Sequence, residues 1–226
     1  MMGATTQPSE AMSPTFTIAH CNLVSDLLQQ LLEGNSDTHL IVCATRAEFM
    51  VQLTAAIRSQ LADPDTAAGH GLLTKTIGLL ARSSKIRLAF CPSLESLRAY
   101  LAVLGPAVDV TIEDGSLSND RQLLAVLDMI ALHVTTSEFS AQGLSRTLAS
   151  VVEASARAGM DLQLYECMDA LDPSSTVKGS KLWDANVPLL NGSVRMRSDQ
   201  NTWGGRGVTV KRVAERWFEF EIGHHH

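Results

Sequence analysis

The segment that comes closest to a phosphate-binding pattern is GHGLLTKT, Gly69 to Thr76. It fits Gly-x-x-x-x-Gly-Lys-Ser/Thr, except that Thr74 stands where the second glycine belongs. In such a loop, glycines allow successive backbone N–H groups to surround phosphate, and the lysine reaches the terminal phosphates. The loop must follow a strand, yet the polar LADPDTAA precedes Gly69. We therefore expect an ordinary helix start here, and an ATPase built on Gly69–Thr76 stays open as an alternative.

A second place for phosphate chemistry is the turn after the apolar run HLIVCA, where an amphipathic helix begins. This turn, residues 44–48, reads ATRAE and contains neither glycine nor lysine. Side chains occupy every position, and Glu48 would repel phosphate. The turn predicts a nucleotide-binding scaffold that does not bind ATP.

Asp128 follows the apolar run LLAVL and could take part in metal chemistry. In a working phosphoryl-transfer enzyme, an aspartate at such a strand end holds Mg²⁺. Without phosphates to share the ion, we expect Asp128 to cap nearby backbone groups instead. The sequence thus predicts no catalytic residue, no metal site and no cofactor.

Basic side chains gather in the C-terminal part of an otherwise acidic chain. From Lys178 to Ile222 there are eight Lys and Arg against five Asp and Glu, whereas the whole chain carries −6. We expect them to neutralise DNA phosphates without reading sequence, with a solvated strand face as the alternative. Trp203 could stack on a base or simply pin its turn. The DNA-binding prediction comprises Lys178, Lys181, Arg195, Arg197, Trp203, Arg206, Lys211 and Arg212.

Other residue types give weaker chemical signals. The four cysteines form no C-x-x-C pair and are predicted to be buried free thiols in a reducing compartment. There is no G-x-S-x-G motif, and His133 follows an apolar run in which a structural histidine is expected. No apolar run is long enough to suggest a membrane span.

Hydrophobic periodicity predicts the elements that position these residues. The helices expected are 23–32, 49–61, 72–82, 94–104 and 144–155, and the strands are 39–44, 85–91, 108–114, 123–128 and 161–167. This alternation indicates an α/β fold with a mainly parallel sheet flanked by helices. Residues 192–198 and 208–222 read as antiparallel C-terminal strands. We expect a disordered tail over 1–15, one domain over 16–223 and a tag remnant at 224–226.

Several blocks, in order, resemble the core of RecA-type recombinases and their paralogs, such as Shu-complex subunits. They are KIRLAFCPSLESLRAYL, RQLLAVLDMIALH, TSEFSAQGLSRTLASVVEASARAGMDLQLYE and the closing LWDANVPLLNGSVRMR and GVTVKRVAERWFEFE. The resemblance spans most of residues 36–222 and implies a RecA-like fold. It implies a noncatalytic nuclear subunit that pairs with related subunits, recombinase and DNA in homologous recombination. An Elongator-like ring, whose accessory subunits use RecA folds without phosphate loops, is the alternative assembly.

The segment FTIA, Phe16 to Ala19, fits the F-x-x-A pattern by which recombinases of this family dock into a neighbouring subunit. A buried aromatic anchor on a flexible arm is well suited to such docking. The resemblance therefore implies partner-binding roles for Phe16 and Ala19. The alternative is that this segment folds onto the core of its own chain.

Overall fold

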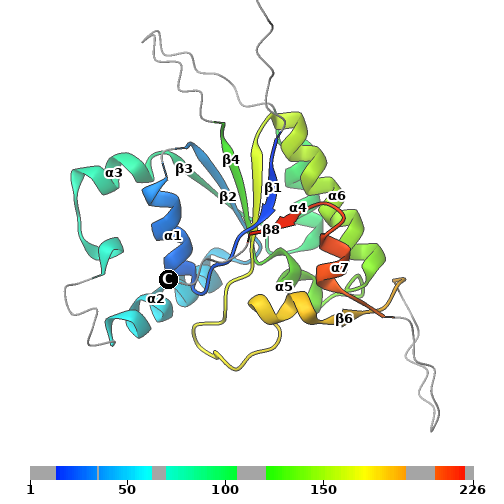
Figure 1. Cartoon of the computed structure of the whole chain (residues 1–226). Coiled ribbons are helices and arrows are strands. Elements are labelled where there is room, and N and C mark those ends of the chain that lie inside the picture. Colours follow the sequence, from blue (N-terminus) through cyan, green and yellow to red (C-terminus); the bar gives the residue numbers. More distant parts are fainter. Residues whose placement is uncertain (1–13, 35, 63–69, 106–120, 192–206, 222–226) are drawn as a thin grey trace, which may run out of the picture.

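The chain folds into a parallel six-stranded sheet with helices on both faces, as a computed structural model shows (Figure 1). The structure describes residues 14–34, 36–62, 70–105, 121–191 and 207–221. The strands lie in the order β3-β2-β4-β5-β1-β8, and each neighbouring pair is parallel. They are β1 (Phe16–Ile18), β2 (Thr38–Val42), β3 (Ile86–Phe90), β4 (Leu123–Leu127), β5 (Asp161–Tyr165) and β8 (Glu219–Phe220). Two short C-terminal strands, β6 (Asn186–Val187) and β7 (Val208–Thr209), pair antiparallel. The predicted fold class is confirmed.

The helices connect these strands and cover the sheet. The α-helices are α1 (Val24–Glu33), α2 (Arg46–Leu61), α3 (Ile77–Ser83), α4 (Leu94–Val103), α5 (Met129–Val134), α6 (Ala141–Ala158) and α7 (Val210–Ala214). Two 3-10 helices, η2 (Gly71–Leu73) and η3 (Ser180–Asp184), lie in the connections. No helix among the described residues is long and apolar enough to cross a membrane.

Two hydrophobic layers lie on opposite faces of the sheet. Leu40 and Val42 of β2 pack with α1 and α2, whereas Ile41 belongs to the layer under α4, α6 and α7 (Figure 1). Successive strand side chains point to opposite faces, so a strand covered on both faces must be apolar throughout. This explains the unbroken apolar runs of β2 and β4.

The order of the strands reverses at one place along the carboxyl edge of the sheet. From β2 the chain continues to β3 at one end of the sheet, and from β4 it continues through β5 to β8 at the other end. The connections therefore diverge from the neighbouring strands β2 and β4. Ligands of open α/β sheets bind at such a switch point.

Some predicted elements are wrong, each for a local reason. The helix expected over 72–82 is divided into η2 and α3, because the Thr76 hydroxyl accepts the Leu79 N–H (3.1 Å) and starts a new helix. The stretch 208–222, predicted as strand only, contains α7, which Thr209 caps by accepting the Arg212 N–H (3.2 Å). The predicted strands 108–114 and 192–198 lie outside the described residues.

Candidate functional site

Asp128 lies at the carboxyl end of β4 in an uncommon backbone conformation. Its φ of 59° is the only positive value at a non-glycine residue in the described ranges. One carboxylate oxygen, Oδ1, accepts the Cys167 N–H (3.1 Å), and Oδ2 lies 3.8 Å from Nζ of Lys178. Asp128 therefore links β4 to the segment that follows β5, which confirms its predicted role as a strand-end capping residue.

Glu166 is the second acid of this edge, and it is buried at the end of β5. Its carboxylate accepts two backbone N–H groups from the first turn of α5, those of Ile130 (2.5 Å) and Ala131 (3.2 Å). Sequence reasoning missed this residue. An acid directly after the apolar strand DLQLY was the signal that could have identified it.

Burial and mutual repulsion govern the ionisation of this acid pair. Burial raises the pKa of Asp128, and the Lys178 ammonium opposes that rise. The pKa of Glu166 is also raised, by burial first and by the neighbouring Asp128 charge second. Lys178, only 25% exposed at its side chain, supplies the compensating charge. This lysine was predicted to contact DNA, and in the structure its ammonium group lies against the Asp128 carboxylate.

Three of the helices that start at this edge have carboxylates of the chain at their N-terminal ends. In α1, Oδ2 of Asp26 accepts the Leu23 N–H (3.0 Å). In α2, Oε2 of Glu48 accepts both the backbone N–H (2.8 Å) and the hydroxyl (2.7 Å) of Thr45. The Thr45 hydrogen bonds lower the pKa of Glu48, so this carboxylate keeps its charge where a phosphate would otherwise lie. With Glu166 at α5, three such ends are occupied.

A small cavity lies at the carboxyl ends of β1, β5 and β8. Its volume is about 80 Å³, and its lining includes His20, Cys21, Glu166, Trp183 and Glu221. Ligand pockets usually measure roughly 300–1,000 Å³. This cavity is therefore smaller than a usual ligand pocket.

The four cysteines are all buried, as predicted, and two of them, Cys43 and Cys91, follow sheet strands directly. Burial raises the pKa of the Cys43 thiol. The neighbouring Cys21 thiol, together with burial, raises the pKa of Cys167. With raised pKa values, Cys43 and Cys167 stay protonated and act as small apolar side chains. Within the described ranges, no three His, Cys, Asp or Glu side chains are placed to hold a metal ion.

The phosphate-loop candidate around Lys75 has a different context from that of a working loop. Residues 70–76 contain η2 and the cap of α3, and Lys75 is exposed. Where the structure describes this segment, a 3-10 helix and not a strand comes before α3, while Gly69 lies outside the described ranges. The context that a phosphate loop requires is therefore missing from residues 70–76.

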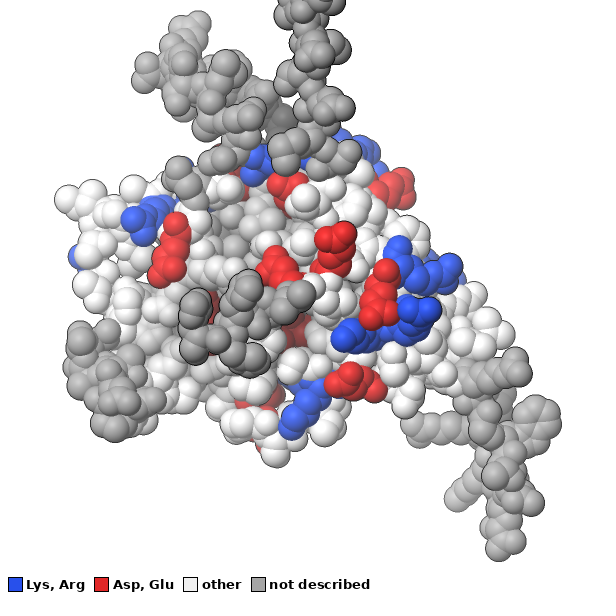
Figure 2. Space-filling view, in the orientation of Figure 1, with Lys and Arg blue, Asp and Glu red and all other residues white. Residues whose placement is uncertain are grey.

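The structure describes three of the other residues predicted to contact DNA. Lys211 and Arg212 are exposed on α7; Nζ of Lys211 lies 5.1 Å from the Phe220 ring centroid, and Arg212 pairs with Glu215 (3.3 Å). Lys181 is exposed in η3. The face in Figure 2 shows Lys and Arg interspersed with Asp and Glu, which is not a uniformly basic surface. The remaining predicted residues, Arg195, Arg197, Trp203 and Arg206, lie outside the described ranges.

Phe16 and Ala19 are part of the fold of their own chain. Phe16 begins β1 between β5 and β8, and its ring packs edge-on against Phe218 at 6.4 Å. Ala19 is buried, with 4% exposure, and its N–H binds the Leu164 carbonyl (3.1 Å). A docking arm at Phe16 would therefore require β1 to leave the sheet.

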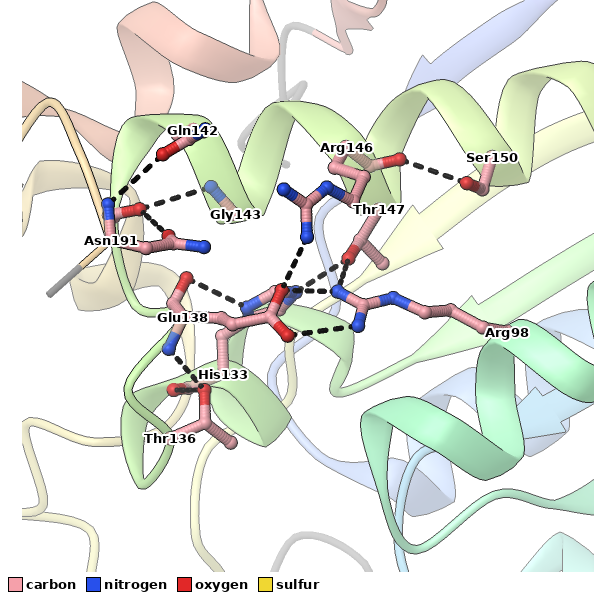
Figure 3. A network of polar contacts seen from close by, with 11 residues as sticks. Arg98, His133, Thr136, Glu138, Gln142, Gly143, Arg146, Thr147, Ser150 and Asn191 are labelled. Atoms are coloured by element: carbon pink, nitrogen blue, oxygen red, sulfur yellow. Dashed lines mark hydrogen bonds and ion pairs between the residues drawn. The ribbon is translucent and has the colours of Figure 1, made fainter.

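A polar network links α4, α5 and α6 (Figure 3). Arg98 of α4 forms two hydrogen bonds to the Glu138 carboxylate (2.9 and 2.5 Å), and Arg146 of α6 lies 3.6 Å from it. His133 is fully buried; it contacts the Thr147 hydroxyl (3.0 Å) and the Glu138 carbonyl (3.3 Å). His133 is thus a structural histidine, as predicted.

Fold and edge together define a parallel α/β protein with two buried acids and a lysine at the carboxyl edge of its sheet. The chain belongs to the SPAC22G7.03-like family, whose model matches residues 18–160. No curated protein matches the chain. The matched residues include Asp128, whereas Glu166 and Lys178 lie beyond them.

Proposed function

We propose that the chain is a noncatalytic, RecA-like subunit of a hetero-oligomeric complex that acts in homologous recombination in the nucleus. The closed carboxyl edge is the observation that carries this proposal, since Asp26, Glu48 and Glu166 occupy the N-terminal ends of three helices. In an open parallel sheet, these amides are the groups that would bind phosphate. The sheet then serves as a scaffold, and the surfaces of the chain bind related subunits and DNA.

Calorimetry with ATP and Mg²⁺ tests the noncatalytic role. Because the amides are occupied and the edge is acidic, we expect no heat beyond dilution for the wild type and for Lys75→Ala alike. Micromolar binding that Lys75→Ala abolishes would overturn this role and favour the ATPase that uses residues 69–76.

Affinity purification of the tagged full chain from its own cells, with quantitative mass spectrometry, tests the assembly. RecA-like recombination subunits in near-stoichiometric amounts would support the proposal. Recovery of translation-modification proteins in their place would overturn it in favour of the Elongator-like ring.

DNA contact is assigned to the exposed basic residues of α7. Reversing Lys211 and Arg212 to Glu should weaken DNA binding by the purified complex similarly for unrelated sequences. Each lost phosphate contact should reduce the slope of log affinity against log salt by about one. Unchanged affinity would show that these residues form an ordinary solvated surface.

A further inference from the structure

β3 is the outermost strand of the sheet, and one side of its backbone has no strand partner among the described residues. The Lys85 carbonyl accepts the Thr38 N–H (2.9 Å), and the Cys91 N–H binds the Val42 carbonyl (2.8 Å). Residues 85 and 91 therefore face β2. Because backbone groups alternate along a strand, the N–H and C=O groups of Ile86, Leu88 and Phe90 point away from β2. They form an open ladder of donors and acceptors.

The two faces of β3 differ in chemistry. Phe90 packs on Phe49 of α2, with ring centroids 5.7 Å apart, so Leu88 shares the α2 face by alternation. Leu88 is nevertheless 49% exposed. The helix that leads into β3, α3, has no buried residue, and its Ile77 and Leu80 are 88% and 68% exposed. Exposed apolar side chains thus lie on β3 and on the helix that precedes it.

Arg87 marks the other face of β3. It lies beside His39 in the register of β2 and β3, on the face where Tyr100 of α4 contacts His39. Arg87 is exposed and forms no ion pair with any residue that the structure describes. Arg82, at the end of α3, adds a second exposed positive charge near the start of the strand.

These features discriminate between possible occupants of the edge. A second copy paired antiparallel about Leu88 would place two Arg87 side chains on one face, one diagonal step apart. Like charges in such positions destabilise a strand pair, whereas opposite charges stabilise it. The edge therefore favours a different chain whose strand has acids on the Arg87 face and apolar residues on the Leu88 face.

We propose that β3 is a docking edge to which a partner protein adds one strand of alternating acidic and apolar residues. The backbone groups of Ile86, Leu88 and Phe90 bind that strand, Arg87 pairs with its acids, and Leu88 packs with its apolar residues. This inference rests on the proposed function, in which the chain is one subunit of a complex, and it names the surface that the complex uses.

Peptide binding to the full-length chain tests the charge preference. The probe is a fluorescein-labelled heptapeptide of alternating valine and glutamate, and the matched control replaces glutamate by lysine. The wild type should prefer the glutamate peptide by about two- to five-fold at low salt, the range expected for cross-strand charge pairs. Arg87→Glu, a surface change, should reverse that preference. Equal affinities, or no binding by either peptide, would overturn the proposal.

Amide hydrogen exchange by NMR tests the docking geometry. Without peptide, the amides of Ile86, Leu88 and Phe90 should exchange fast while those of Arg87 and Ala89 are protected by β2. The glutamate peptide should protect the first three. Protection of these three in the chain alone would overturn the proposal, since a second copy or the chain's own residues 106–120 would then cover the edge.

A backbone variant keeps the test independent of charge. Leu88→Pro removes the central outward N–H without removing a bond to β2, and proline is tolerated in this way on edge strands. It should abolish peptide binding with little change in melting temperature. Undiminished binding by a folded Leu88→Pro chain would overturn the proposal, and the Arg87→Glu result decides if that variant does not fold. Failure of these tests leaves the subunit role to be judged by the affinity purification.

Discussion

Acidification should weaken the fold through His133, the buried histidine between α5 and α6. Its ring has no exposed surface and has two polar contacts, with the Glu138 carbonyl (3.3 Å) and the Thr147 hydroxyl (3.0 Å) (Figure 3). Burial lowers the pKa of His133 from 6.5 to about 4, and the nearby Arg98 charge acts in the same direction. The folded chain therefore resists protonation of this ring.

The size and sign of the effect follow from that difference in pKa. Above about pH 6.5 the ring is neutral in both states, so His133 adds no pH dependence. As the pH falls below about 6.5, the His133 ring becomes protonated in the unfolded chain while it stays neutral in the folded chain. The free energy of unfolding therefore decreases until the pH reaches about 4. At about 1.4 kcal/mol for each unit of pKa, the free energy of unfolding should fall by about 3 kcal/mol.

Urea unfolding of the wild type and His133→Gln at a series of pH values isolates this contribution, because most other groups titrate alike in both chains. The glutamine amide can accept the Thr147 hydroxyl but loses the bond to Glu138, so the variant should be about 1–2 kcal/mol less stable near neutral pH. That gap should close and reverse as the pH falls to about 4. A control, Thr147→Val, keeps the histidine and should retain the wild-type pH dependence. Parallel curves for wild type and His133→Gln would refute the reasoning.

Three further substitutions test other contacts by equilibrium unfolding. Lys178→Met leaves Asp128 and Glu166 without their cation and should lower the free energy of unfolding by about 1–3 kcal/mol. Adding Asp128→Asn to the same chain should restore part of that loss. Unchanged stability in Lys178→Met would mean that the 3.8 Å pair between Lys178 and Asp128 contributes nothing. Phe16→Ala should cost about 2 kcal/mol or more by removing a ring from β1, and an unchanged melting temperature would instead suit a docking arm. Arg98→Lys removes the paired hydrogen bonds to the Glu138 carboxylate and should lower the free energy of unfolding by about 1–2 kcal/mol. Equal stability would show that these paired hydrogen bonds do not stabilise the fold.

The central strands could be predicted because their signals are local. β2 and β4 contain apolar runs covered on both faces, β5 alternates polar and apolar residues, and the alternation of strand and helix indicates a parallel sheet. The helix predicted over 144–155 lies within α6, which ends before Gly159, a residue with the left-handed φ of 70° that glycine adopts at low cost. Each of these features depends on a few neighbouring residues.

The short strands β1 and β8 could not be predicted from such local signals. β1 has three residues and β8 has two, so neither shows a period, and both depend on pairing with distant parts of the chain. The acidic site has the same property. Asp128 was recognised by its position after a strand, but its pairing with Lys178 requires the loop after β5 to fold back across the edge. A list of basic residues cannot show that one of them is already paired.

In the proposed noncatalytic subunit, the scaffold would persist without ligand chemistry because the helix starts have acceptors of their own. Orphan N–H groups at helix starts need acceptors, and Asp26, Glu48 and Glu166 supply them from within the chain. Removing one acid would not open a phosphate site, because the other carboxylates would still repel the ligand. The proposed loss of nucleotide binding would thus be spread over several independent contacts. Selection can then act on the surfaces, where β3 presents an unpaired edge and α7 presents its basic side chains.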